Sequence, residues 1–550
     1  MTLNNLKPIV VGAALFALAA SSFAALPELR IKTQNGQTPV VIGADGFMGG
    51  SGVKVHNYVA IDSVKLVDPN NSRNNVTGNF RIDSIRTRGN STSMGLEKKP
   101  YRIKFGGKTS LFGKPAAKSW VLLANYFDQT FALNAIAFEL GNRMGVGFTQ
   151  SSHFVNLYMN DKYLGIYQIT EQIQADENRV NIGKKKGWLV EFDYHEDDDV
   201  AFETKSYKLP SHIKSPDEWP ANDTNYNFVK REVNAMCDSM ASSKFPNNGY
   251  RDMVDLQSFA AYLMIQMVMD NSDFNRKSTS PYGANGSTQA VPGSNFIYKD
   301  KDSVDAAGKV VVRRKIYAGP LWDFDLAAGV TADLSKFPKH FVTYQDSIKP
   351  GHTFYRRFYQ DDVFKAKYQK TWNKHLKDFQ DMPALMDSIA NLLSGDIERN
   401  FNSYNLAACN GYACNHPSPV KPRTLAEYKD EVAKLKSWWN SRIDFYGKEL
   451  AKMNIDISKD IAEPSGPTSA ASAARQQTRQ VGLKVIKNGL TVTANNGAEV
   501  VVVSLNGNVV RKRVFTSGNH SVRLGDLPKG MYLARVELDG VRKMARIAVR

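Results

Sequence analysis

The sequence predicts a mixed α+β fold followed by a small all-β domain at the C-terminus. With 550 residues the chain is long enough for two to four domains of roughly 150 residues each. Apolar residues at helical spacing alternate with β-branched runs up to residue 460, whereas only short β-branched runs follow residue 480. Between them, the segment 464–474 consists of small residues and prolines, which can bury little and are typical of a linker.

The N-terminus predicts a signal peptide over residues 1–24. A charged start, Met1–Lys7, precedes the apolar run Ile9–Ala20 and the small-residue site at Ser22–Ala24. The apolar run is shorter than the ~20 residues that a membrane-spanning helix needs, and no later segment qualifies either. We therefore expect an exported chain without a transmembrane segment once the signal peptide is removed.

Residues 25–80 predict an N-terminal β-rich region, and residues 81–460 predict a larger domain that begins with strands. A strand over Ile82–Arg88, a small-residue loop and a strand over Pro100–Phe105 open this domain. Apolar residues three and four positions apart then predict a helix over 133–144. Further strands are expected at 153–159, at 163–169 and around Trp322, and further helices at 228–240, 253–269, 354–393 and 425–453.

Residues 481–550 predict a small β-sandwich after a linker over 461–480. Its runs are separated by Asn-Gly or Asp-Gly at 488, 506 and 539, dipeptides that tight hairpin turns favour because both central residues need positive φ. Six strands are expected, at 483–486, 490–494, 500–505, 509–515, 531–538 and 544–549.

The formal net charge of +17 raises the question of nucleic-acid binding. Lys and Arg are interleaved with Asp and Glu, and no compact basic arm with aromatic stacking residues occurs. We therefore expect no nucleic-acid partner, but attraction to anionic substrates or envelope surfaces. Three cysteines are too few for a disulfide framework: Cys409 and Cys414 could form a local bridge, and Cys237 is expected to be a buried thiol.

Two acidic segments stand at the ends of apolar elements rather than on a solvated face. Asp270–Asp273 follows the apolar helix, and Trp322–Asp325 belongs to a strand-like run. Metal-dependent phosphoryl transfer needs such carboxylates, one to orient a hydroxyl and another to hold magnesium. Asp323 lies between Trp and Phe, where an unpaired carboxylate would be costly, so a ligand role is favoured. Asp270 is interpreted as a cap of the helix end.

Five separated motifs connect the predicted phosphoryl-transfer site with a known protein family. They are Arg88-Gly-Asn-Ser-Thr92, Lys98-Lys-Pro-Tyr-Arg-Ile-Lys104, Trp120-Val-Leu-Leu-Ala-Asn-Tyr-Phe-Asp128, Tyr163-Leu-Gly-Ile-Tyr-Gln-Ile-Thr-Glu171 and Pro320-Leu-Trp-Asp-Phe-Asp325. In this order they resemble the CotH kinase family, the atypical kinases named for a spore-coat protein, over roughly 26–450. The resemblance implies an atypical protein-kinase-like bilobal domain that uses ATP with Mg²⁺ (or Mn²⁺).

The resemblance also implies a partner and a location. CotH kinases imply phosphorylation of Ser or Thr on a secreted or cell-envelope protein substrate. The segments Leu505–Val510 and Leu527–Tyr532 resemble the C-terminal sorting domains of type IX secretion cargo. We expect a secreted or cell-surface protein, and a monomer. The alternative is a catalytically silent surface module for adhesion or assembly beside polysaccharide-degrading machinery, with Trp438 and Trp439 as exposed aromatics or, as their helical setting favours, as core residues.

Carried over motif by motif, the resemblance implies the role of each candidate residue. Asp273 would orient the substrate hydroxyl, Asp323 would bind the metal, and Asp325 is a second acidic candidate at the same metal. Lys104 would contact the α- and β-phosphates, with Glu139 as its ion-pair partner. The nucleotide would be covered and flanked by Gly89, Asn90, Ser91 and Glu171.

One position departs from the kinase pattern. An Asn five residues after the catalytic Asp commonly holds a second metal, but this chain has Ser278 there. A polar insert, 280–294, then separates the loop from Asn295. Either Ser278 or Asn295 could substitute, or the metal site could be reduced, which would favour the silent module.

Overall fold

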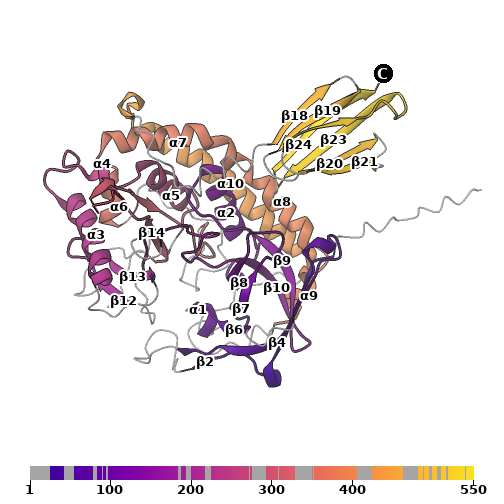
Figure 1. Cartoon of the computed structure of the whole chain (residues 1–550), viewed down its shortest axis with the longest axis horizontal. Helices are drawn as coiled ribbons and strands as arrows, with labels where there is room; N and C mark the ends of the chain where they lie inside the picture. Colours follow the sequence, from indigo (N-terminus) through magenta and orange to yellow (C-terminus); the bar gives the residue numbers. More distant parts are fainter. Residues whose placement is uncertain are drawn as a thin grey trace, which may run out of the picture.

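The computed structural model places β-strands and α-helices in a mixed α+β arrangement (Figure 1). It describes residues 25–42, 55–78, 83–89, 91–94, 97–183, 187–193, 200–216, 224–271, 273–274, 293–307, 309–328, 350, 352–404, 424–461, 481–486, 488–494, 498–504, 509–515, 518–538 and 541–549. The predicted signal peptide and nearly all of the predicted linker lie outside the described residues.

The N-terminal strands close into a barrel. Strand β1 (Glu28–Thr33) pairs in parallel with β9 (His153–Met159) on one side and antiparallel with β4 (Val59–Val67) on the other. The ring runs through β1, β9, β10 (Lys162–Glu171), β8 (Ala117–Leu123), β7 (Tyr101–Thr109), β6 (Ser84–Thr87) and β4, and β5 (Val76–Gly78) is added beside β4. The predicted β-rich region 25–80 therefore shares one sheet with the strands that follow it.

Alternation along β7 separates an apolar face inside the barrel from a polar face outside it. In β7 the side chains of Tyr101, Ile103 and Phe105 are buried in the barrel core, whereas Arg102 and Lys104 point to the other face. Because side chains on facing strands share a face, Arg86 of β6, paired with Arg102, lies on this outer face too. The barrel thus presents basic side chains to its surroundings.

A helix follows the barrel strand β8. Helix α2 (Leu133–Met144) begins where Asp128 Oδ2 accepts the backbone N–H of Leu133 at 2.8 Å, and it ends at Gly145, whose φ of 75° is left-handed. The predicted spacing of apolar residues over 133–144 is confirmed, since this face of α2 is buried in the main core.

Five of the remaining strands before residue 320 form a second sheet. Its five strands run in the order β12 (Val200–Glu203), β13 (Pro210–Ser215), β11 (Trp188–Phe192), β14 (Asn295–Lys299) and β17 (Ile316–Ala318). Four further strands of two or three residues form two small ladders: β2 (Val41–Ile42) with β3 (Val55–His56), and β15 (Ser303–Val304) with β16 (Val310–Val312).

Helices make up most of the chain after residue 350. They are α6 (Thr353–Phe358), α7 (Asp362–Gln380), α8 (Met382–Leu393), α9 (Ile397–Asn402) and α10 (Leu425–Lys452), preceded along the chain by α1 (Ser91–Met94), α3 (Thr224–Ala241), α4 (Tyr250–Met253) and α5 (Leu256–Val268). Of the side chains in α5, all but Gln257 are buried, because α2, α7 and α10 pack around it. No helix among the described residues is long and apolar enough to cross a membrane.

The C-terminal strands form two small sheets, drawn in yellow as a body of their own in Figure 1. One contains β18 (Val481–Ile486), β19 (Gly489–Ala494) and β22 (Gly518–Arg523); the other contains β20 (Ala498–Ser504), β21 (Val509–Phe515), β23 (Gly530–Leu538) and β24 (Val541–Val549). Their inner faces share one apolar core, as expected for a sandwich. Six of the strands were predicted, and β22 was not.

Candidate functional site

The segment after β17 turns sharply and is not the predicted strand. Asp323 has a φ of 62°, which a non-glycine residue adopts only at a cost of order 1 kcal/mol unless its surroundings impose it. Two asparagines do so: Asn271 Nδ2 donates to the carbonyl of Asp323 at 3.2 Å, and Asn134 Oδ1 accepts the backbone N–H of Phe324 at 3.1 Å. The prediction of a strand at Trp322 is wrong because these contacts hold a turn instead.

The turn brings carboxyl groups together. Desolvation raises the pKa of Asp323, although the opposite charge of Arg88 and a hydrogen bond from Ser294 counteract this. The pKa of Asp325 is raised further, by desolvation first and then by the negative charges of Asp323, Asp273 and Asp128. Asp325 also shares a hydrogen bond with Asp323. The site therefore concentrates negative charge that the protein itself only partly neutralises.

Asp273 reaches this cluster from the end of α5. After the helix, Asp270 has a φ of 48° and its N–H bonds to the carbonyl of Met267 at 3.3 Å, so it belongs to the turn that ends the helix. The backbone N–H of Asp273 donates to Asn271 Oδ1 at 3.2 Å. Since Asn271 also holds Asp323, one side chain fixes both acidic segments relative to each other.

A serine hydroxyl lies beside the carboxylate of Asp323. Ser294 Oγ donates to Asp323 Oδ2 at 3.3 Å, and its backbone N–H donates to Asp193 Oδ2 at 2.9 Å. Asn295 is fully buried and bonds to Gly293 and Tyr262 instead. Ser278 lies outside the described residues, so Ser294 is the serine that the structure brings to Asp323.

The outer face of the barrel provides positive charge opposite the acidic cluster. The Arg88 guanidinium lies 4.8 Å from the ring centroid of Trp322. Desolvation lowers the pKa of Arg88, as do the charges of Arg86 and Arg102, whereas Asp323 acts in the opposite direction. Like charges are rarely gathered without a counter-ion, so this face suits an anion.

Two of these arginines contact neutral groups. Arg102 Nη2 donates to the neutral hydroxyl of Ser119 at 3.0 Å, and the Arg86 guanidinium lies 5.1 Å from the ring centroid of Tyr58. The Nε of Arg86 is buried and lacks a hydrogen-bond partner among the described residues. Glu191, the second acidic neighbour of Arg88, is also paired with Lys214 at 2.8 Å.

The predicted ion pair between Lys104 and Glu139 is absent from the part of the chain that the structure describes. Glu139 lies on the exposed side of α2 and pairs with Arg143 Nε at 2.7 Å, one helical turn away. Lys104 is exposed, with Nζ 5.9 Å from the ring centroid of Tyr58. The pairing prediction is wrong because helical geometry points Glu139 away from the acidic cluster, whereas Asn134 on the same helix points toward it.

The predicted nucleotide-flanking residues have local roles in the chain. Gly89 has a φ of 77° and its carbonyl accepts a bond from Ser93 Oγ at 2.6 Å, which closes the loop after β6. Ser91 begins the short helix α1, and Asn90 lies outside the described residues. Glu171, at the end of β10, is buried and accepts bonds from the backbone N–H and the Oγ of Ser151.

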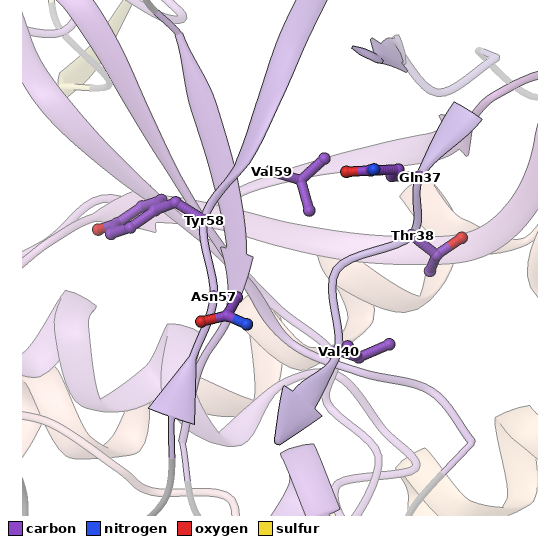
Figure 2. A pocket seen from close by; sticks show the side chains of 6 residues that line it. All are labelled: Gln37, Thr38, Val40, Asn57, Tyr58 and Val59. Atoms are coloured by element: carbon purple, nitrogen blue, oxygen red, sulfur yellow. The ribbon is translucent and has the colours of Figure 1, made fainter. Parts of the chain in front are cut away.

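A shallow hollow lies beside the basic face (Figure 2). It measures about 430 Å³ and is lined by Gln37, Thr38, Val40, Asn57, Tyr58 and Val59. Figure 2 shows Tyr58 pointing away from the facing segment that carries Gln37 and Thr38. The lining contains no charged residue, so the hollow has no obvious chemistry of its own.

The donor set fits a divalent cation. No group of three or more His, Cys, Asp or Glu side chains gathers as a ready-made metal cage among the described residues. Mg²⁺ is commonly held by only one or two carboxylates, with waters and substrate phosphates as its other ligands. The adjacent Asp323 and Asp325 supply two, and their mutual repulsion would be offset by the cation.

Several residues at the site were not singled out from the sequence. Arg88 was quoted only as part of a motif, and Asn134, Asn271 and Ser294 were not assigned a role. The sequence does contain a pattern that could have identified them, since each is a polar residue within or beside an apolar run. Their partners, however, lie far away along the chain, which local patterns do not reveal.

Two protein families match separate parts of the chain. Residues 85–446 match the family described as CotH kinase protein, and residues 486–550 match the secretion system C-terminal sorting domain. A search of curated proteins finds no match. The sorting domain indicates export by type IX secretion, to the cell surface or beyond. Since the first match spans well over half of the 550 residues, the chain belongs to the CotH kinase protein family.

Proposed function

We propose that this protein is an exported atypical Ser/Thr kinase that transfers the γ-phosphate of ATP to a secreted or cell-envelope protein. The observation that carries the proposal is the meeting of opposite charges at Arg88 and Asp323. An arginine-rich face above a carboxylate pair suits a metal–triphosphate complex, which carries anionic oxygens and a cation side by side.

The arrangement of the chain supports a bilobal, kinase-like domain. The barrel and α2 would form one lobe, and the helices from α5 onward would form the other. The acidic segments would lie where the lobes meet, because Asn134 of α2 binds the backbone of Phe324 at 3.1 Å. This order of strands, helix and two acidic loops is the one that kinases use.

Each residue has a separate task in this proposal. Asp323 and Asp325 would hold the metal, which neutralises charge on the phosphates when it is bound. Arg88 would bind phosphate oxygens, and Lys104 at the rim of the same barrel face stays a predicted phosphate contact. Asp273 would accept a hydrogen bond from the substrate hydroxyl and orient it for attack.

The experiment separates the two acidic roles. Asp323→Ala should abolish phosphate incorporation together with Mg²⁺-dependent nucleotide binding. Asp273→Ala should retain both ligands, while turnover falls by roughly 10²- to 10⁴-fold, as for loss of a general base. Nucleotide affinity is measured by calorimetry with and without Mg²⁺, and transfer with radiolabelled ATP.

Two results would contradict the proposal. If the wild type binds no nucleotide at any metal concentration, the protein is a silent surface module of the same family. If Asp273→Ala alone loses metal binding, the two roles are reversed. Trp438 and Trp439, considered as sugar-stacking residues of such a module, are buried in α10, which confirms their core role.

A further inference from the structure

A hairpin that joins β14 to β17 exposes an unusual number of apolar side chains. Strands β15 and β16 form a two-stranded ladder outside the five-stranded sheet. Val304, Val310, Val311 and Val312 are 46%, 43%, 59% and 41% exposed. Because neighbours in a strand point to opposite faces, neither face of β16 is covered by the described residues. Such patches on soluble proteins commonly mark interaction sites.

The edge of this hairpin is also open. Val310 and Val312 pair with Val304 and Ser303 on one side only. No described strand lies along the other side of β16. A strand edge with free backbone groups is a template for another extended segment. The surface therefore offers both main-chain pairing and apolar side-chain contacts.

Positive charge surrounds the valines. Lys301, Lys309 and Arg313 are exposed, and within the described residues their side chains form no ion pair. The nearby carboxylates are engaged: Asp302 pairs with Lys299 at 2.9 Å and accepts the N–H of Arg314, and Asp305 accepts the N–H groups of Ala307 and Lys309 in the turn. Over residues 299–315 six Lys and Arg face three Asp, so the net charge of the hairpin is positive.

The positive charge of the hairpin distinguishes two possible occupants of the free edge of β16, a second copy of the chain and an acidic segment of another protein. A second copy of the chain would pair antiparallel about Val311, which places Lys309 of one copy opposite Arg313 of the other. Like charges directly opposite each other in a ladder are destabilising. An extended segment with acidic ends would instead place carboxylates against both cations.

We infer that the β15–β16 hairpin is a docking site for an extended, acidic segment of a partner protein, which adds as a strand to β16. The hairpin connects β14, which starts directly after Ser294, to β17, which leads to Asp323. A docked partner is thus held on the same structural unit as the acidic cluster. Docking itself requires neither nucleotide nor metal, so it stands apart from the proposed kinase activity.

The test is peptide binding to the full mature chain. The probe is a fluorescent peptide of sequence Asp-Glu-Val-Thr-Val-Thr-Val-Glu-Asp, followed by fluorescence anisotropy in the absence of ATP and metal. Val311→Asp and Arg313→Glu should each weaken binding by at least about tenfold, the change given by ~1.4 kcal/mol. Val514→Asp, at a valine 52% exposed on β21, should leave affinity unchanged.

Two altered peptides test the mode of binding. Methylation of alternate backbone nitrogens should abolish binding, because it removes the donors that pair with a strand edge. Replacement of the acidic ends by lysine should abolish it as well. Equal binding of the wild type and Val311→Asp, no binding of the acidic peptide, or dimerisation of the free wild type through this hairpin in sedimentation would each overturn the inference.

Discussion

Two acidic centres in this molecule differ in how their charge is satisfied. Asp361 is fully buried, and Arg251 donates to both of its carboxylate oxygens, at 2.6 and 2.9 Å. Tyr250 and the backbone N–H of Val363 complete its hydrogen bonds. Asp323, by contrast, has a long hydrogen bond from Ser294 and a second carboxyl, Asp325, beside it.

This difference indicates different roles: Asp361 stabilises the fold, whereas Asp323 and Asp325 belong to the candidate functional site. The hydrogen bonds of Asp361 raise the pKa of Arg251 and start α7, so both ionised groups stabilise the fold. Burial raises the pKa of both Asp323 and Asp325, and the neighbouring negative charges raise that of Asp325 further, so ionisation costs stability there. Perturbed groups of the second kind cluster at functional sites.

The largest expected effect on stability is at Asp361. Asp361→Ala should lower the free energy of unfolding by about 3–5 kcal/mol, because it leaves Arg251 and Tyr250 without their buried partner. Urea denaturation followed by circular dichroism measures it. Asp444→Ala, which removes a surface pair with Lys448 one turn away in α10, is the control and should change little. Equal losses in both variants would show that the buried centre is not architectural.

A smaller change is expected from the basic face. Arg88→Gln should weaken ATP binding roughly 10- to 100-fold, which corresponds to a lost hydrogen bond to a charged group. Arg30→Gln, on strand β1, is the control because Arg30 is paired with Glu28. Calorimetry with ATP and Mg²⁺ gives both affinities. Unchanged affinity in Arg88→Gln would remove the phosphate role from this face.

Removal of a carboxyl from the pair Asp323 and Asp325 should stabilise the protein, whereas removal of the Asp361 carboxyl should destabilise it. Asp325→Asn removes one of two adjacent carboxyls and should stabilise the metal-free protein, because burial and the neighbouring negative charges disfavour the ionised form of Asp325. The same variant should lose the rise in melting temperature that Mg²⁺ gives the wild type. Thermal unfolding with EDTA and then with Mg²⁺ tests both. A variant less stable than wild type in EDTA would mean that Asp325 is architectural.

The smallest effect is a pH dependence of the metal response. Because folding raises the pKa of Asp325, the native state binds more protons than the unfolded state, so metal-free stability falls as pH rises from about 4 through that raised pKa. Bound metal favours the ionised form and removes this loss. The Mg²⁺-induced shift in melting temperature should therefore be larger at high pH than at low pH. A shift independent of pH would contradict the raised pKa.

Sequence patterns predicted the elements whose stabilising contacts are local. The helix at 133–144 and the hairpins after 488, 506 and 539 depend on periodicity and turn residues, which a single stretch of chain contains. Strand β22 was missed because Gly518, Asn519, His520 and Ser521 break the β-branched pattern. Its place is decided by pairing with β19.

The acidic residues of the site were predicted, but most of their partners were not. An Asp within an apolar run is costly wherever it folds, so Asp323 could be recognised from the sequence. The contact of Arg88 with Trp322 joins the barrel to the turn after β17, and only the tertiary fold creates it. Glu139 was assigned a role and Asn134 was not, because sequence alone does not say which side of α2 faces the site.

The most direct test of the site is metal binding at Asp323. Electron paramagnetic resonance of Mn²⁺ measures the free ion in the presence of protein and ATP, without requiring transfer. We predict that the wild type immobilises Mn²⁺ together with ATP and that Asp323→Asn, folded by circular dichroism, does not. Equal immobilisation by the two proteins would contradict the assignment of this acidic cluster as the metal site.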